Sequence, residues 1–65
     1  MEDKVMKAQQ QVADKLDKIL FFKSEEMSTI EQHTLENIIY QIRELNKPLN
    51  YDDAQIAVKA IIKYS

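Results

Sequence analysis

His33 and Tyr40 are the side chains of this sequence whose types best suit acid–base chemistry. They lie seven residues apart in a segment with helical periodicity, so both are expected on the outer face of one helix. No nucleophile or oxyanion-binding group accompanies them, and a chain of 65 residues has little room for a pocket. We therefore expect no catalytic residues and no enzyme. His33 is interpreted as a surface residue and Tyr40 as part of a binding surface, where tyrosine is enriched.

The adjacent acids Asp52 and Asp53 are the second group that could do chemistry, as metal ligands or as paired carboxylates. They are expected in the first turn of a helix, where negative charge is favourable next to the positive end of the helix dipole. The sequence has no cysteine and a single histidine, which leaves no ligand set for structural zinc. We expect neither a metal nor a cofactor.

The size and charge of the chain restrict its class. A domain of 65 residues buries only about 60% of the surface that its unfolded chain exposes, so its core is marginal without a disulfide, a metal or a second subunit. A homodimer is therefore expected. The polar start of the chain and a longest apolar run of residues 19–22 predict no signal peptide and no membrane span, hence a cytoplasmic protein. The net charge is −2, without the basic surface of a nucleic-acid binder.

Hydrophobic periodicity predicts an all-α chain of three helices in one domain, residues 1–65. The helices are expected over about residues 2–22, 29–46 and 51–64. The short link between the second and third favours an αα-hairpin, packed in a homodimeric helical bundle. Whether the first helix packs on its own chain or on a neighbour is left open.

Local signals support the second and third helices. Ser28 followed by Glu31 is a capping box, in which the serine hydroxyl accepts from the Glu31 amide and the carboxylate returns to the Ser28 amide. The second helix must end before Pro48, and Asn46 can take the left-handed conformation that follows a helix. Asn50 is a suitable N-cap for the third helix.

The apolar residues of the helices divide into a predicted core and a predicted interface. The third helix is apolar almost all round, which indicates burial on more than one side. Its second arc, Ile56, Ala60 and Tyr64, is predicted to meet a second chain, together with Tyr40 and Phe22. The predicted core comprises Val12, Leu16, Ile19, Ile30, Leu35, Ile38, Ile42, Leu45, Ala57, Val58 and Ile61.

Residues 34–50, TLENIIYQIRELNKPLN, resemble a signature of small enterobacterial regulators of biofilm development and acid resistance, the AriR/YmgB–YcgZ family. Residues 53–62 fit the second helix of that pattern, and residues 14–15 and 22–24 are similar to the run before its first core helix. The resemblance covers about residues 14–62. It implies an all-helical, dimer-forming bacterial regulator that acts through protein contacts feeding a two-component phosphorelay; DNA binding has also been proposed for the family. No catalytic residues can be carried over.

Three functional hypotheses follow from these observations. The first is a non-enzymatic regulator or connector that binds a signalling protein through helix faces. The second is a DNA-binding regulator that uses the hairpin, although its reading helix would begin with two aspartates and offer only Lys59 and Lys63 to phosphate. The third is a secretion cochaperone or antitoxin-like stabiliser that folds fully on its client. No small-molecule substrate is expected.

Overall fold

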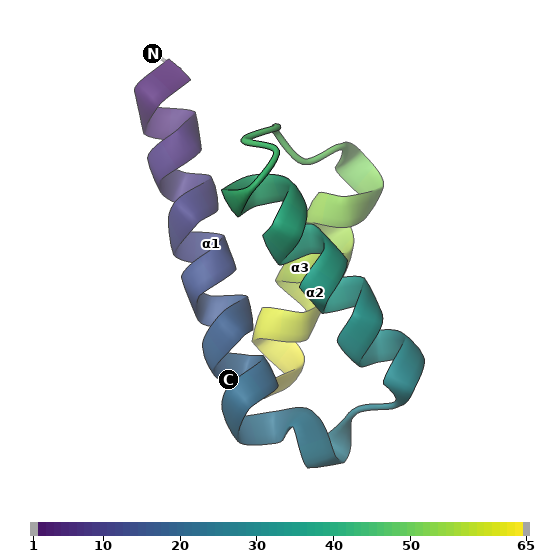
Figure 1. The fold of residues 1–65 in the computed structure, drawn as a ribbon. Coiled ribbons are helices and arrows are strands. Elements are labelled where there is room, and N and C mark those ends of the chain that lie inside the picture. The colour runs from purple at the N-terminus through teal and green to yellow at the C-terminus, as the bar shows by residue number, and fades with distance from the viewer. Residues whose placement is uncertain (1, 65) are drawn as a thin grey trace.

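The chain folds into three helices that pack against one another. A computed structural model describes residues 2–64, so residues 1 and 65 of the predicted domain lie outside the described residues. The elements, in order, are α1 (Glu2–Lys23), a short 3-10 turn η1 (Ser24–Glu26), α2 (Thr29–Arg43) and α3 (Tyr51–Tyr64). Figure 1 shows no strand in this part of the chain. The prediction of an all-α fold with three helices is confirmed.

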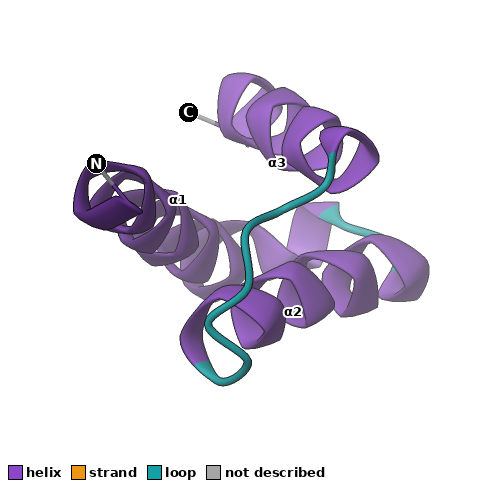
Figure 2. Cartoon of the chain, turned by 90° about the horizontal axis from the view of Figure 1, so that it is seen from above, coloured by secondary structure: helices purple, strands orange, loops and turns teal. Residues whose placement is uncertain are grey.

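The first helix contacts both of the others. In Figure 2 the three helices enclose a common centre, and the link from α2 to α3 crosses over one end of the bundle. α1 makes most of the interhelical contacts, with α2 and then with α3. α2 and α3 cross each other in Figure 1 instead of running side by side, so the predicted αα-hairpin is an open one. Its two helices are held together mainly through α1.

The end of α2 lies at Arg43, earlier than residue 46. The Glu44 and Leu45 amides both donate to the Tyr40 carbonyl, at 2.8 and 3.3 Å, so the regular helical bonding stops there. Asn46 then takes the left-handed conformation expected from the sequence, with φ of 53°. The prediction that Leu45 belongs to the core is therefore wrong. Leu45 lies beyond the end of α2, off its inward face, and is 44% exposed.

Both predicted N-caps are confirmed. The Ser28 hydroxyl accepts from the Glu31 amide at 3.1 Å, and the Asn50 side-chain oxygen accepts from the Asp53 amide at 2.8 Å. The other half of the predicted capping box differs. The Glu31 carboxylate accepts a hydrogen bond from the Tyr64 hydroxyl at 2.8 Å and not from the Ser28 amide, because α3 brings the Tyr64 ring against the start of α2.

Removing the Asn50 cap should destabilise the whole domain. We expect Asn50→Ala to lower the free energy of unfolding by about 1 kcal/mol, because the Asp53 amide loses its acceptor, and Asn50→Asp to keep most of it. Urea unfolding followed by circular dichroism measures the difference. Asn37→Ala, at an exposed position inside α2, is the control and should be neutral or slightly stabilising, since alanine is the better helix former. An equal loss at both positions would contradict the cap.

The core is formed by one face of each helix and by the link after α1. Six of the predicted core residues are buried: Leu16, Ile19, Leu35, Ile38, Ile42 and Ala57. Two others, Val12 and Ile61, are partly buried against them. Ala13 and Met27 are also buried, and neither was in the predicted core. Met27 follows a 3-10 turn, outside the regular helical spacing on which the prediction depended.

The orientation of α3 corrects several predictions. Ala60 and Tyr64, predicted to meet a second chain, are only 6% and 7% exposed and belong to the core of their own chain. Val58, predicted in the core, is 52% exposed. The buried residues of α3 are Ala57, Ala60 and Tyr64. They lie three and four residues apart, and they combine one residue of the predicted core with two of the predicted interface.

Ile30 is also exposed, at 79%, and not in the predicted core. On a helix of 3.6 residues per turn it lies about 140° around the axis from the buried Leu35. Glu31 occupies the position closer to the core face, which is why it can reach Tyr64.

Candidate protein-docking groove

The residues that suited catalysis or metal binding do not come together in the structure. His33 and Tyr40 are both exposed on α2, and neither side chain has a hydrogen bond or ion pair within the described part of the chain. Asp52 and Asp53 occupy the first turn of α3, as expected for helix-dipole stabilisation. No group of three potential metal ligands is found among residues 2–64. The same residues include no helix with the length and hydropathy of a membrane span.

A groove between α2 and α3 is lined by both apolar and charged residues, and we call it the α2/α3 groove. Its volume is about 440 Å³. It is lined by Ser28, Ile30, Glu31, Thr34 and Leu35 from the start of α2, and by Ile56, Lys59, Ala60 and Lys63 from α3. Five of these residues come from α2 and its N-cap and four from α3, so the groove lies between the two helices.

The groove has a buried apolar floor and exposed apolar sides. Leu35 and Ala60 belong to the core and form the floor. Ile30 lies on one side at 79% exposed, and Ile56 on the other at 39%. The Thr34 hydroxyl donates to the Ile30 carbonyl at 2.8 Å, so its proton is already used. The groove therefore offers apolar surface on both sides to a binding partner.

The charged residues of the groove differ in whether they already have a partner of opposite charge within the chain. The Lys63 amine lies 3.7 Å from the Glu31 carboxylate, which also accepts from the Tyr64 hydroxyl. The Tyr64 hydroxyl and then the Glu31 charge raise the pKa of Lys63. Lys59 has no side-chain partner among the described residues. One positive charge at the groove is therefore available to an acidic group.

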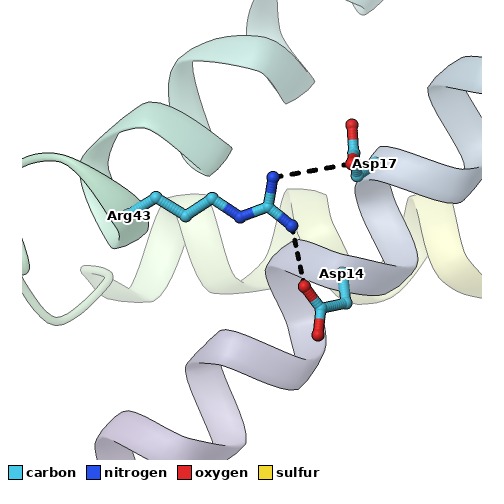
Figure 3. Close-up of polar contacts among 3 residues, drawn as sticks. All are labelled: Asp14, Asp17 and Arg43. Atoms are coloured by element: carbon cyan, nitrogen blue, oxygen red, sulfur yellow. Dashed lines mark hydrogen bonds and ion pairs between the residues drawn. The ribbon is translucent and has the colours of Figure 1, made fainter.

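Polar contacts fix the position of α2, which carries half of this groove. The Arg43 guanidinium joins α2 to α1, with one nitrogen 2.7 Å from an Asp14 oxygen and the other 3.5 Å from an Asp17 oxygen (Figure 3). The hydrogen bond to Asp14 is the largest of the effects that raise the pKa of Arg43. At the other end of α2, the Gln32 amide donates to the carbonyls of Ser24 and Met27 at 3.0 and 3.3 Å.

Only part of this site was predictable from the pattern. Ile56 belonged to the predicted interface and lines the groove, whereas Ala60 contributes only to the floor. Tyr40 and Phe22, also predicted at an interface, are exposed but are not among the lining residues. The Phe22 ring instead packs edge to face on Phe21, with ring centres 5.0 Å apart, and both rings are exposed. Ile30 lines the groove but was predicted in the core. Its angular distance from Leu35 around the helix axis was the sequence feature that could have placed it outside the core.

Comparison with protein-family models, curated proteins and solved structures finds no match to this chain. The resemblance of residues 14–62 to the AriR/YmgB–YcgZ family therefore stays a prediction.

Proposed function

We propose that this protein is a small non-enzymatic connector that works by protein–protein contact, and that the α2/α3 groove binds an amphipathic helix of its partner. The observation that supports this most strongly is the pair of exposed isoleucines, Ile30 and Ile56, on opposite sides of a groove with an apolar floor. An amphipathic helix can place its apolar face in such a groove. Isolated surface isoleucines need no explanation, but two that flank one groove form a continuous apolar surface.

The charges of the groove indicate the chemistry of the partner helix. The Lys59 amine has no partner within the described residues, whereas the Lys63 amine already pairs with the Glu31 carboxylate. A partner helix with apolar residues on one face and an aspartate or glutamate beside them matches this arrangement. Such a charge at the edge of an interface mainly affects specificity and the association rate.

The resemblance to the AriR/YmgB–YcgZ regulators suggests which proteins to examine first. We propose a component of a bacterial two-component phosphorelay, in the cytoplasm, that controls biofilm formation or acid resistance. The homodimer is also a proposal. Because Ala60 and Tyr64 are buried in their own chain, the dimer would have to use another part of α3, for which the exposed Tyr51 is available.

Substitutions in the groove should separate partner binding from folding. The phosphorelay proteins of the source bacterium, purified one by one, are titrated with the chain by calorimetry. We expect one of them to bind, and Ile56→Asp or Ile30→Asp to weaken that binding by at least about tenfold, because an apolar anchor becomes a charge in a desolvated groove. Lys59→Glu should slow association, with the largest effect at low salt.

Val58→Asp is the matched control, since Val58 is an exposed apolar residue of α3 outside this groove. It should leave partner affinity within about twofold, with all four variants folded by circular dichroism. A partner whose affinity falls with Val58→Asp and is unchanged by Ile30→Asp and Ile56→Asp would overturn the assignment of the groove. Absence of binding by all relay proteins would overturn the proposed partner class.

A further inference from the structure

The outer side of α1 carries a row of positive charge. Figure 2 shows both other helices on one side of α1, so its opposite side faces solvent. At 3.6 residues per turn, four lysines and Phe22 fall within about 80° of arc on that side. The lysines, all exposed, are Lys4, Lys7, Lys15 and Lys18. With Phe21 beside them these residues form what we call the α1 basic face, which is about 27 Å long at a rise of 1.5 Å per residue.

The lysines of this face are unpaired, although α1 also carries acids. None of them has an ion pair with another described residue, and no acidic residue falls inside the arc. Asp14 lies at the edge of the arc and Asp17 beyond it, but both carboxylates contact Arg43, at 2.7 and 3.5 Å (Figure 3). The chain has a net charge of −2, yet this face is positive.

Two exposed phenyl rings stand at the end of the α1 basic face. Phe22 lies within the arc and Phe21 beside it, and the rings are 73% and 79% exposed. They pack edge to face on each other, outside both the core and the α2/α3 groove. Single apolar residues on a surface need no explanation, whereas adjacent large ones mark an interaction site. The binding partner of this face must therefore combine negative charge with an apolar layer.

An anionic lipid bilayer meets both requirements better than nucleic acid does. Proteins that bind single strands stack bases on open aromatic faces, whereas these two rings pack on each other. Arginine is the residue best suited to phosphates of nucleic acid, and Arg43, the only arginine, is already bound to two aspartates. A bilayer surface presents diffuse negative charge that attracts lysines, and the acyl boundary beneath it can bury phenyl rings.

We propose that the α1 basic face binds the surface of an anionic lipid bilayer. α1 lies along the headgroups, its lysines attract the anionic lipids, and Phe21 and Phe22 insert at the boundary between headgroups and acyl chains. The long apolar stems of the lysines let their amines stay at the level of the headgroups while the rings insert. The α2/α3 groove shares no residue with this face, so the proposal does not depend on the proposed function.

Sedimentation of the full chain with lipid vesicles tests the proposal. We expect binding to phosphatidylcholine vesicles that contain about 30% phosphatidylglycerol, and at least about tenfold weaker binding to pure phosphatidylcholine. The affinity for the anionic vesicles should fall as salt rises from about 0.05 to about 0.5 M, because screening weakens the attraction between lysines and headgroups. Glu25→Gln removes an exposed acid of η1 and should strengthen binding to the anionic vesicles.

Two double variants separate the charge from the insertion. Lys15→Gln with Lys18→Gln should weaken binding about 25-fold and flatten its salt dependence, since each lysine near an anionic surface contributes about fivefold. Phe21→Ser with Phe22→Ser should weaken binding at least about tenfold and leave the salt dependence unchanged, because only apolar burial is lost. Lys59→Gln, at an exposed lysine of α3, is the control and should stay within about twofold. All these positions are exposed, so circular dichroism should show folded variants.

Several outcomes would contradict the proposal. Equal binding to neutral and anionic vesicles, or an unchanged affinity of the lysine pair, would remove the role of charge. An unchanged affinity of the phenylalanine pair would remove the insertion. Binding of a single-stranded oligonucleotide without binding of anionic vesicles would make this face a nucleic-acid site. Phenyl NMR signals that follow protein concentration, without vesicle binding, would show that a second copy of the chain covers the rings.

Discussion

Replacing Ile38 with alanine should remove a large part of the stability of this protein, whereas the same replacement at Ile30 should have almost no effect. Ile38 is 1% exposed and Ile30 is 79% exposed, although both are isoleucines of α2. Truncation of a buried isoleucine costs about 2–5 kcal/mol, from lost apolar burial and from the cavity left behind. The total for a domain of this length is roughly 3–10 kcal/mol, so Ile38→Ala should lose a large fraction of it.

Urea unfolding of both variants at two protein concentrations measures the difference. Ile30→Ala should lie within about 0.5 kcal/mol of the parent, as exposed substitutions usually do. A large loss of unfolding free energy in Ile30→Ala that grew on dilution would show that Ile30 is buried in a dimer. A large loss at Ile30 independent of concentration would contradict its place on the outside of α2.

Replacing Tyr64 with alanine should destabilise the folded chain itself by about 3 kcal/mol. Tyr64 is 7% exposed, packs in the core and donates its hydroxyl to Glu31 at 2.8 Å. The alanine variant loses both the ring and the hydrogen bond. Tyr64→Phe keeps the ring and should lose only about 1 kcal/mol, since the exchange leaves one oxygen of Glu31 without this donor.

The concentration dependence of these losses distinguishes a core residue from an interface residue. Unfolding free energies from circular dichroism should fall by the same amount at low and high protein concentration. Sedimentation equilibrium should show that Tyr64→Phe leaves the molar mass of the parent unchanged. If Tyr64→Ala instead stayed folded and only lowered the molar mass, Tyr64 would be an interface residue, as its sequence pattern predicts.

The groove illustrates how a binding surface arises where an apolar residue is left outside the core. Ile30 is exposed because Glu31 takes the position closer to the core face, where its carboxylate meets Tyr64. The same contact brings the end of α3 against the start of α2, which places Ile56 across from Ile30. The hydrogen bond between Tyr64 and Glu31 thus links the core to the proposed docking surface.

Local patterns were enough to predict the three helices and the N-caps of α2 and α3. Ser28 and Asn50 cap the next helix through amides three residues away, and Asn46 takes its left-handed conformation close to Pro48. These are interactions over a few residues, so the tertiary fold is not needed to recognise them. The inward row of α2, which includes Leu35 and Ile38, was also predictable from its three- and four-residue spacing, although Ile30 at the edge of the same stripe lies outside the core.

The buried face of α3, in contrast, depends on how this helix packs against the other two. Two rows of α3 have equally good helical spacing, and the pattern favoured Val58 over Ala60 for the core. In the folded chain, the small Ala57 and Ala60 let α3 approach its neighbours closely, and Tyr64 fills the far end while its hydroxyl reaches Glu31. Hydrophobic periodicity measures how apolar a face is, whereas packing selects the face whose shape and hydrogen bonds fit the other helices. The α2/α3 groove depends on that choice, because Ile56 and Lys59 face it only when Ala57, Ala60 and Tyr64 pack inward.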